Sequence, residues 1–271
     1  MTVLRALPAR GALPVRGALP ARPLVATNAT LASRIDVTAT MAEFVVVLDA
    51  PLAAYRSGQY VSLGVEHGGE LVQRPYSIVS VGMSGTRVEL LVRRLPDGRL
   101  SNLLWALAPG ARLRVGPPRG LFVLDAHDAR PRLMVGTGTG VAPLLAMLAD
   151  SAARRDAAPN VLIHGVSYWV ELAYGERIAG WAAAGLPIDY RPTVSRPHER
   201  RNSGWCGPVG RAETRLEELL ADSPAARNGV AYLCGNPDMI EACRRVLLAA
   251  GVAAADIRAE QFHAPHGPRV A

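Results

Sequence analysis

The chain has 271 residues, of which 49% are hydrophobic and 20% charged, a composition typical of a globular protein long enough for two domains. No apolar run approaches the ~18 residues that a membrane span needs, so we expect no membrane partner. The net charge is +7, but residues 1–35 hold five of the 30 basic residues and none of the 23 acids. The remaining residues include 25 basic and 23 acidic side chains, a net charge of +2. No nucleic-acid partner is therefore expected.

All 30 basic residues are arginines, so a phosphate must be bound by guanidinium groups or by backbone amides. The three cysteines, Cys206, Cys234 and Cys243, show no CxxC spacing, which argues against an iron–sulfur or zinc site. A low, odd number of cysteines is typical of a reducing compartment. We therefore expect a cytoplasmic protein without a bound metal.

Residues 6–23 consist of three hexapeptides that each begin with Ala-Leu-Pro. Proline at every sixth position prevents a continuous helix, and the composition cannot form a core. The segment is rich in arginine like a transit peptide, but it lacks serine and helical amphipathicity. We expect residues 1–28 to be a disordered basic extension without a targeting role.

Short β-rich runs separated by turns extend from residue 29 to about residue 127. The predicted strands cover residues 35–40, 43–48, 60–65, 74–81, 87–93, 112–115 and 121–124, and one short helix covers 100–107. Ser101 is expected near the N-cap of that helix. Six or more closely spaced strands predict a small antiparallel barrel.

After Asp128 the pattern changes to alternating strands and helices. Strands are expected at 133–135, 161–166, 188–194 and 230–233, and helices at 141–150, 171–184, 211–220 and 238–250. This alternation predicts a parallel sheet with helices on both faces. The second domain is expected to cover residues 128–263, followed by a C-terminal extension over 264–271.

The segment Arg74-Pro75-Tyr76-Ser77 combines a cation, a flat aromatic ring and a small hydroxyl before an apolar run. These groups suit a flavin, because they offer charge for its phosphate, a face for its ring and a hydrogen bond for its edge. The alternative is an ordinary strand with an exposed arginine and a half-buried tyrosine.

A glycine-rich turn between a predicted strand and a predicted helix is typical of a dinucleotide site. Glycines let backbone amides approach a pyrophosphate, and the helix N-terminus favours its charge. The turn consists of Gly136, Thr137, Gly138, Thr139 and Gly140. Its GxGxG spacing departs from GxGxxG, and a tight strand-to-helix turn is the alternative.

Cys234-Gly235-Asn236 also lies between a predicted strand and a predicted helix. It places a thiol at the carboxyl end of a strand, where open α/β sheets bind ligands. Asn236 or Asp238 is a candidate N-cap for the next helix. The alternative is a buried cysteine in a capped turn.

Four motifs occur in an order that resembles the bacterial type of the ferredoxin–NADP(+) reductase family. They are Arg-Pro-Tyr-Ser at 74–77, Gly-Thr-Gly-Thr-Gly-Val-Ala-Pro at 136–143, His-Gly-Val-x-x-x-x-Glu-Leu-Ala-Tyr at 164–174 and Cys-Gly-Asn-Pro-x-Met at 234–239. The resemblance covers about residues 30–263. It implies a Greek-key β-barrel that binds FAD, over 29–127, followed by an α/β domain that binds NADP(H).

The resemblance also implies roles for individual residues at the flavin. Arg74 would contact the FAD phosphates, Tyr76 would stack on the isoalloxazine, and Ser77 would lie near flavin N5. The helix start at Leu100 and Ser101 would cradle the FAD pyrophosphate.

At the nicotinamide, the resemblance implies that Gly138 and its neighbours hold the NADP pyrophosphate and that Cys234 lines the nicotinamide site. Glu260 would tune the site together with Ser77 and Cys234. Phe262 would cover the flavin face opposite Tyr76, although nine residues follow it in this chain.

For the 2′-phosphate of NADP, Arg196 matches a family phosphate-binding arginine. A second arginine is common in relatives at the position that Ser167 occupies here, so this chain departs from the pattern. Ser167 can still donate a hydrogen bond, and Arg200 or Arg201 is a possible substitute.

The implied activity is electron transfer between NADPH and ferredoxin or flavodoxin by a monomeric enzyme. NADPH would give a hydride to flavin N5, and the reduced flavin would release its electrons singly. One alternative is an NAD(P)H-dependent reductase of free flavin or another small acceptor. Another is a non-enzymatic electron-transfer subunit of a larger complex.

Overall fold

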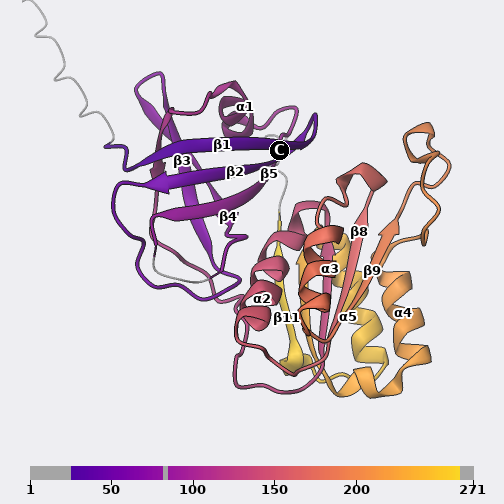
Figure 1. Ribbon diagram of the computed structural model, residues 1–271. Coiled ribbons are helices and arrows are strands. Elements are labelled where there is room, and N and C mark those ends of the chain that lie inside the picture. Colours follow the sequence, from indigo (N-terminus) through magenta and orange to yellow (C-terminus); the bar gives the residue numbers. More distant parts are fainter. Residues whose placement is uncertain (1–25, 82–84, 263–271) are drawn as a thin grey trace, which may run out of the picture.

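The computed structural model describes residues 26–81 and 85–262, in which a barrel-like sheet and a layered α/β unit lie side by side (Figure 1). Most of the predicted N-terminal extension and the chain from residue 263 onward lie outside the described residues. Within the described part, none of the helices combines the length and the apolar character that crossing a membrane requires.

Six antiparallel strands form the first sheet in the order β4-β3-β6-β1-β2-β5. They are β1 (Ala29–Thr38), β2 (Met41–Leu48), β3 (Tyr60–His67), β4 (Glu70–Ser77), β5 (Arg87–Arg93) and β6 (Arg112–Val115). An antiparallel bridge between Ile78 and Leu90 joins the two edges of the sheet. The sheet therefore curls into the predicted barrel, with β6 inserted between β3 and β1.

The barrel strands follow the expected alternation and turn chemistry. The β3–β4 hairpin turns at Gly68 and Gly69, whose φ angles of +62° and +77° favour glycine. Helix α1 (Arg99–Ala106) begins one residue earlier than predicted, and Gly98 is its N-cap. Ser101 lies in the first turn of this helix, where its hydroxyl accepts a hydrogen bond from the Leu95 amide and donates one to the Gly98 carbonyl.

The predicted strand 121–124 does not form. Leu121 is 96% exposed, whereas Phe122 and Leu124 pack into the core of the α/β unit. The Leu124 amide bonds to the Ser57 carbonyl, but the segment joins no strand ladder. Its apolar side chains pack where the chain passes from the barrel to the α/β unit, and the segment adds no strand to the barrel.

Five parallel strands form the second sheet in the order β11-β10-β7-β8-β9. They are β7 (Arg132–Thr137), β8 (Asn160–Val166), β9 (Ile188–Val194), β10 (Val230–Gly235) and β11 (Ile257–Gln261). The last strand was not predicted, because Arg258 and Glu260 interrupt its apolar pattern at the sheet edge. The strand order reverses between β7 and β10, where open α/β sheets bind ligands.

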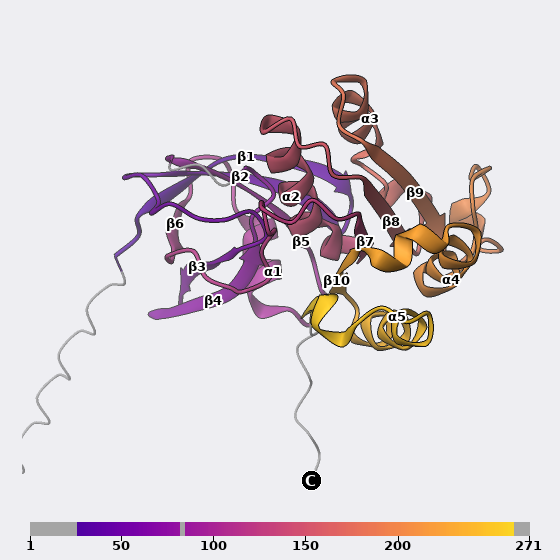
Figure 2. The ribbon, with the colours of Figure 1, turned by 90° about the horizontal axis from the view of Figure 1, so that it is seen from below.

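Helices cover both faces of this sheet, as predicted (Figure 2). Those with side chains in the core on one face are α2 (Val141–Ala153) and α3 (Gly175–Ala183), and those on the other are α4 (Ala212–Asp222) and α5 (Pro237–Ala249). Shorter 3₁₀ turns are η1 (Gly138–Gly140), η2 (Trp169–Glu171), η3 (Arg200–Asn202), η4 (Pro224–Asn228) and η5 (Ala254–Asp256).

Helix α3 is shorter than the predicted helix 171–184. Residue Leu172 has ψ +55°, which ends η2, and the regular helix begins only at Gly175. Glu171 is thereby turned away from the helix and toward the barrel, where it meets Arg93. The break in the helix thus creates an ion pair between the two units.

Apolar and polar contacts join the two units. Met41, Val79 and Leu91 of the barrel belong to the same buried cluster as α2. The Tyr174 hydroxyl donates to the buried Glu43 carboxylate over 3.0 Å, and burial together with that carboxylate raises the pKa of Tyr174. The two units therefore share one buried cluster, next to the separate core of the barrel.

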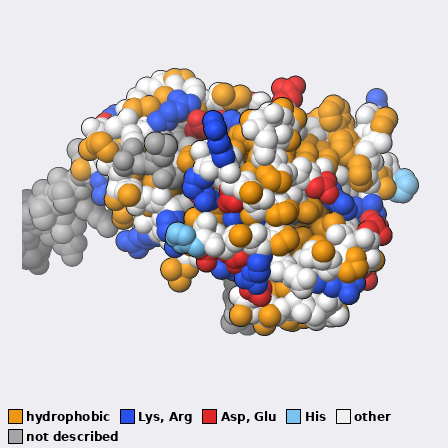
Figure 3. Space-filling view, turned by 60° about the horizontal axis from the view of Figure 1, so that its bottom comes forward, with side chains coloured by type: hydrophobic (Ala, Val, Ile, Leu, Met, Phe, Trp, Pro, Cys, Tyr) orange, Lys and Arg blue, Asp and Glu red, His pale blue; other side chains and the backbone are white. Residues whose placement is uncertain are grey.

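The outer surface mixes the two charge types. On the face seen in Figure 3, arginine and acidic side chains lie next to one another between broad apolar areas. Many arginines pair with nearby carboxylates, as Arg130 does with Asp128 and Asp256. These two contacts raise the pKa of Arg130, and the Arg130 guanidinium lowers the pKa of Asp128 to about 2.

Candidate functional site

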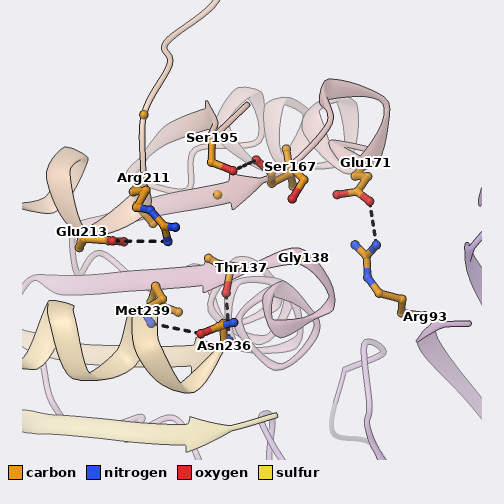
Figure 4. Close-up of a pocket in the computed structure, with 14 residues that line it drawn as sticks. Arg93, Thr137, Gly138, Ser167, Glu171, Ser195, Arg211, Glu213, Asn236 and Met239 are labelled. Carbon is orange, nitrogen blue, oxygen red and sulfur yellow. Dashed lines mark hydrogen bonds and ion pairs between the residues drawn. The ribbon is translucent and has the colours of Figure 1, made fainter. Parts of the chain in front are cut away.

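A cavity of about 200 Å³ opens at the carboxyl ends of the parallel strands, at the point where the strand order reverses. Its wall contains four of the predicted site residues and several that were not predicted (Figure 4). The predicted residues are Thr137, Gly138, Ser167 and Asn236. The others include Arg93, Glu171, Ser195, Arg211 and Glu213.

The glycine loop has a backbone that only glycine accommodates. Gly138 has φ +54°, and a Cβ on Gly140 would lie 2.3 Å from the Cys234 carbonyl oxygen. A Cβ on Gly136 would lie 3.0 Å from Leu144 of α2. Thr139 belongs to the same turn, η1. The loop is therefore held tightly between β10 and α2, with its backbone facing the cavity.

The second turn is locked to the first. The Asn236 amide donates to the Thr137 hydroxyl over 3.1 Å, and a Cβ on Gly235 would lie 2.4 Å from that oxygen. The Asn236 side chain accepts the amides of Asp238 and Met239, so Asn236 is the N-cap of α5. Both turns and both helix starts thus meet at one cavity.

One end of the cavity is closed by an ion pair between the two units. Arg93 of β5 donates to Glu171 over 2.8 Å, and the Glu171 side chain is only 5% exposed (Figure 4). A guanidinium nitrogen of Arg93 would lie 3.2 Å from a Cβ on Gly138. Positive charge therefore stands directly over the glycine loop, where it favours a phosphate.

The other end is formed by Ser167, Ser195, Arg211 and Glu213. Arg196 does not line this cavity; its guanidinium contacts Glu199 and the Tyr168 hydroxyl. Arg201 stacks on the Tyr168 ring at 3.8 Å, and Arg200 lies in the adjoining turn η3.

The barrel and the sheet also meet beside the cysteine predicted to line the nicotinamide site. The Ser77 hydroxyl, at the end of β4, donates to the Glu260 carboxylate over 3.4 Å. Glu260 is the register partner of Cys234 on the neighbouring strand. The structure thus brings Ser77, Cys234 and Glu260 together, from three distant parts of the chain.

Burial shifts the pKa values of Cys234 and Glu260. It raises the pKa of the Cys234 thiol well above its usual range, and the Glu260 charge raises it further. Burial also raises the pKa of Glu260, although the hydrogen bond from Ser77 lowers it. A neutral thiol is a poor nucleophile, so the geometry favours a role of Cys234 in lining a site.

Of the other residues predicted to bind flavin, Arg74, Pro75 and Tyr76 lie on β4, and Phe262 directly follows β11. Arg74 is exposed and has no carboxylate partner within the described part of the chain, and Pro75 next to it is also exposed. Tyr76 packs against the barrel core, and burial raises its pKa to about 12. Phe262 donates its amide to the Gly235 carbonyl and packs against the second core.

The first turn of α1 offers free backbone amides rather than side chains. Leu100 is buried in the barrel core, and the Ser101 hydroxyl is used within the loop. No side chain caps this helix. Its first N–H groups are therefore available to a phosphate. Together with the exposed Arg74 guanidinium, which pairs with no carboxylate in the described part of the chain, they fit the phosphate groups that FAD carries.

Motif analysis missed Arg93, Glu171, Arg211 and Glu213, which line the cavity. Arg93 belongs to the barrel, and Arg211 and Glu213 belong to a helix start without a glycine-rich motif. Glu171 falls inside the motif at 164–174, but it had no assigned role. One available signal was Gly210-Arg211 at the start of the predicted helix 211–220.

Two family models match successive parts of the chain. The family described as oxidoreductase FAD-binding domain matches residues 28–124, and the oxidoreductase NAD-binding domain family matches residues 134–245. Ferredoxin–NADP reductase B of Sorangium cellulosum is 32% identical over 201 residues, which cover 73% of this chain and 81% of that protein.

Reductase components of demethylase and dioxygenase systems are similar as well. The reductase subunit of an aromatic O-demethylase from Amycolatopsis is 31% identical over 225 residues, which cover 81% of this chain but only 64% of that protein. The crystal structure of Amycolatopsis cytochrome P450 reductase GcoB superposes with a TM-score of 0.77 at 28% identity. That match covers 87% of this chain and 69% of that one.

These matches confirm the fold and the two cofactors that the motifs predicted. The chain belongs to the ferredoxin–NADP reductase family, and it is an oxidoreductase that binds FAD and NAD(P)H and transfers electrons through the flavin.

Proposed function

We propose that this protein is a ferredoxin–NADP(+) reductase that transfers electrons between NADPH and ferredoxin or flavodoxin. The observation that carries the proposal is the contact between Ser77 and Glu260 beside Cys234. It joins the end of the flavin motif to the edge of the nucleotide-binding sheet. A flavin held by the barrel and a nicotinamide held by the sheet would meet at this point.

The flavin side would be held by Arg74 at the phosphates, by Tyr76 with Pro75 at the ring, and by the amides at Leu100 and Ser101. FAD supplies the hydride acceptor and the capacity to release electrons one at a time. The Ser77 hydroxyl would lie at the edge of the flavin ring. The Glu260 carboxyl would exchange protons with the flavin as it is reduced and oxidised.

Further residues would orient the coenzyme and close the flavin site. Gly138 and Arg93 support pyrophosphate binding, because backbone without a side chain and a guanidinium face the same space. Cys234 would line the nicotinamide, and Phe262 would cover the flavin face opposite Tyr76. Holding the two rings in contact is the main contribution of such a site to the rate.

An oxygenase component is a second candidate acceptor. It is favoured by the 31% identity to an O-demethylase reductase subunit, of which this chain covers 64%. Reduction of free flavin is a third, and it requires weak retention of FAD. The monomeric state and the cytoplasmic location stay predictions.

The proposal is tested first by the visible spectrum of the purified full chain. We expect a bound-FAD spectrum that NADPH bleaches without oxygen, followed by rapid reduction of added ferredoxin. Tyr76→Ser should weaken FAD binding roughly tenfold through loss of ring stacking, whereas Tyr76→Phe should retain it. A protein without flavin affinity contradicts the proposal. Bleaching without transfer to ferredoxin or flavodoxin would leave an oxidoreductase with another acceptor.

A further inference from the structure

Strand β11 forms one edge of the parallel sheet and carries Glu260 near its carboxyl end. The strand pairs with β10, and it pairs with no second strand in the described part of the chain. Its outer side has no ladder of backbone hydrogen bonds, so side-chain contacts must fix it there. One such contact is the hydrogen bond that Glu260 accepts from Ser77 of the barrel.

Arg258 makes a second set of contacts, two residues before Glu260 and on the same face of the strand. Its Nη1 atom donates to the Tyr232 hydroxyl over 3.1 Å and to the Val123 carbonyl over 3.4 Å. Its Nη2 atom lies 3.7 Å from the Asp125 carboxylate. Val123 and Asp125 belong to the segment that leads from the barrel to β7, so Arg258 connects the edge strand to that segment.

The groups that Arg258 contacts are themselves held in place. Tyr232 is 1% exposed and is the register partner of Arg258 on β10. Its ring packs edge-on against Phe122, with 6.0 Å between the ring centroids, and its hydroxyl accepts the Asp125 amide over 3.4 Å. The Arg258 guanidinium carbon lies 5.4 Å from the centre of the Tyr232 ring, within the range of a cation–π contact. Arg258 therefore rests on a buried, well-packed base.

The spacing on β11 links Arg258 to the position of Glu260. Two residues of a strand span about 7 Å, and an extended segment is stiff over this distance, so a shift at Arg258 also displaces Glu260. The hydrogen bond from Ser77 to Glu260 is 3.4 Å long, against about 2.8 Å for a typical hydroxyl donor. A small displacement is therefore enough to break it.

We propose that Arg258 is a positioning residue of the redox site. It anchors β11 to the segment between the two units and thereby holds the Glu260 carboxyl beside Ser77 and Cys234. Arg258 acts through Glu260 and not by contact with either ring. This inference rests on the part of the proposed function that places the flavin and the nicotinamide here, and not on the choice of electron acceptor.

Hydrogen exchange of the purified FAD-loaded full chain tests the anchor without any turnover. Arg258→Met keeps an apolar side chain over Tyr232 and removes the hydrogen-bond donors. We expect the β11 amides to exchange about tenfold faster in this variant, and the amides of the central strand β7 to exchange as in wild type. Arg258→Lys keeps one charged donor and should stay within about threefold of wild type.

The rate at which NADPH reduces the bound flavin without oxygen tests whether the anchor acts through Glu260. At saturating NADPH, Arg258→Met should lower this rate about tenfold and leave the Kd of NADP+ unchanged. When Glu260→Gln is already present, the same substitution should change the rate less than about twofold, because the carboxyl that Arg258 positions is missing.

Arg191→Met is the matched control, because Arg191 lies on β9, the opposite edge strand, and its side chain is 38% exposed against 31% for Arg258. It should change neither the exchange of β11 nor the rate. Unchanged β11 exchange in Arg258→Met overturns the inference, and so do equal rate losses with and without Glu260→Gln. Flavin reduction without transfer to ferredoxin or flavodoxin contradicts the proposed function alone. Wild-type protein that retains no FAD contradicts both.

Discussion

The two predicted ligand sites are built in different ways. The flavin side of the barrel presents side chains on a strand, with Arg74 exposed and Tyr76 packed against the core. The coenzyme side of the sheet presents backbone, because Gly138 adopts a positive φ and a Cβ on Gly140 would clash with the Cys234 carbonyl. At the flavin side, removing one side chain should lower the affinity by the contribution of that side chain alone. At the coenzyme side, adding a Cβ to a loop glycine should displace the backbone that binds the ligand.

The sharpest way to break this comparison is Gly140→Ala. The new Cβ would lie 2.3 Å from the Cys234 carbonyl oxygen, so two backbone segments must move apart. We expect a loss of about 3 kcal/mol or more in the free energy of unfolding, together with loss of NADP+ binding. Chemical denaturation and ligand titration measure the two effects.

Gly180→Ala is the control for that change, because a Cβ at this position of α3 meets nothing within 4 Å. It should leave coenzyme binding unchanged and stabilise the protein by up to about 1 kcal/mol. Equal behaviour of the two alanine variants would show that the loop tolerates side chains.

Low pH should reduce the free energy of unfolding through His164 of the parallel sheet. This residue is fully buried on β8 and contacts the Tyr190 hydroxyl. Burial lowers its pKa from 6.5 to about 4. Between pH 6.5 and 4, His164 is therefore protonated in the unfolded protein but neutral in the folded protein. The stability present above pH 6.5 is lost as the pH falls toward 4. Between about pH 7 and about pH 5 this amounts to about 2 kcal/mol.

Denaturation of wild type and His164→Gln at both pH values isolates this contribution. The variant should lose about 2 kcal/mol less than wild type over the same interval. His67→Gln, at an exposed position of the barrel, should behave like wild type. Identical pH dependence in all three proteins would rule out His164 as the cause.

The smallest expected effect is on the barrel side, from Arg74→Ala. Removing one guanidinium from a phosphate should weaken FAD binding about tenfold and leave the fold intact. Fluorescence titration of the apoprotein with FAD measures this. Arg87→Ala removes a barrel arginine that pairs with Glu89, and it should not change FAD affinity. A full loss of folding in Arg74→Ala would contradict the contrast between the two sites.

The sequence patterns predicted much of the fold because local signals were strong. The strands at 87–93, 112–115 and 188–194 have the predicted bounds. The prediction of a strand at 121–124 was wrong, because the apolar residues of this segment pack between the two units and do not pair with another strand. Strand β11 was missed because Arg258 and Glu260 interrupt its apolar pattern, and Glu260 bonds to Ser77 from this edge strand.

The site was predictable where motifs lie in the turns themselves, as at Thr137, Gly138 and Asn236. It was not predictable where tertiary placement supplies the residue. Arg93 comes from the barrel, and Arg211 reaches the cavity only because Gly165 lets α4 approach β8. No spacing along the chain encodes that approach.

The buried cluster that Met41, Val79 and Leu91 share with α2 has a practical consequence for engineering. A chimaera that exchanges the barrel for that of a relative must bring matching side chains at these three positions. Otherwise the mismatched interface leaves apolar surface exposed on the α/β unit. The chimaera then aggregates, even when every residue that binds a cofactor has been transferred.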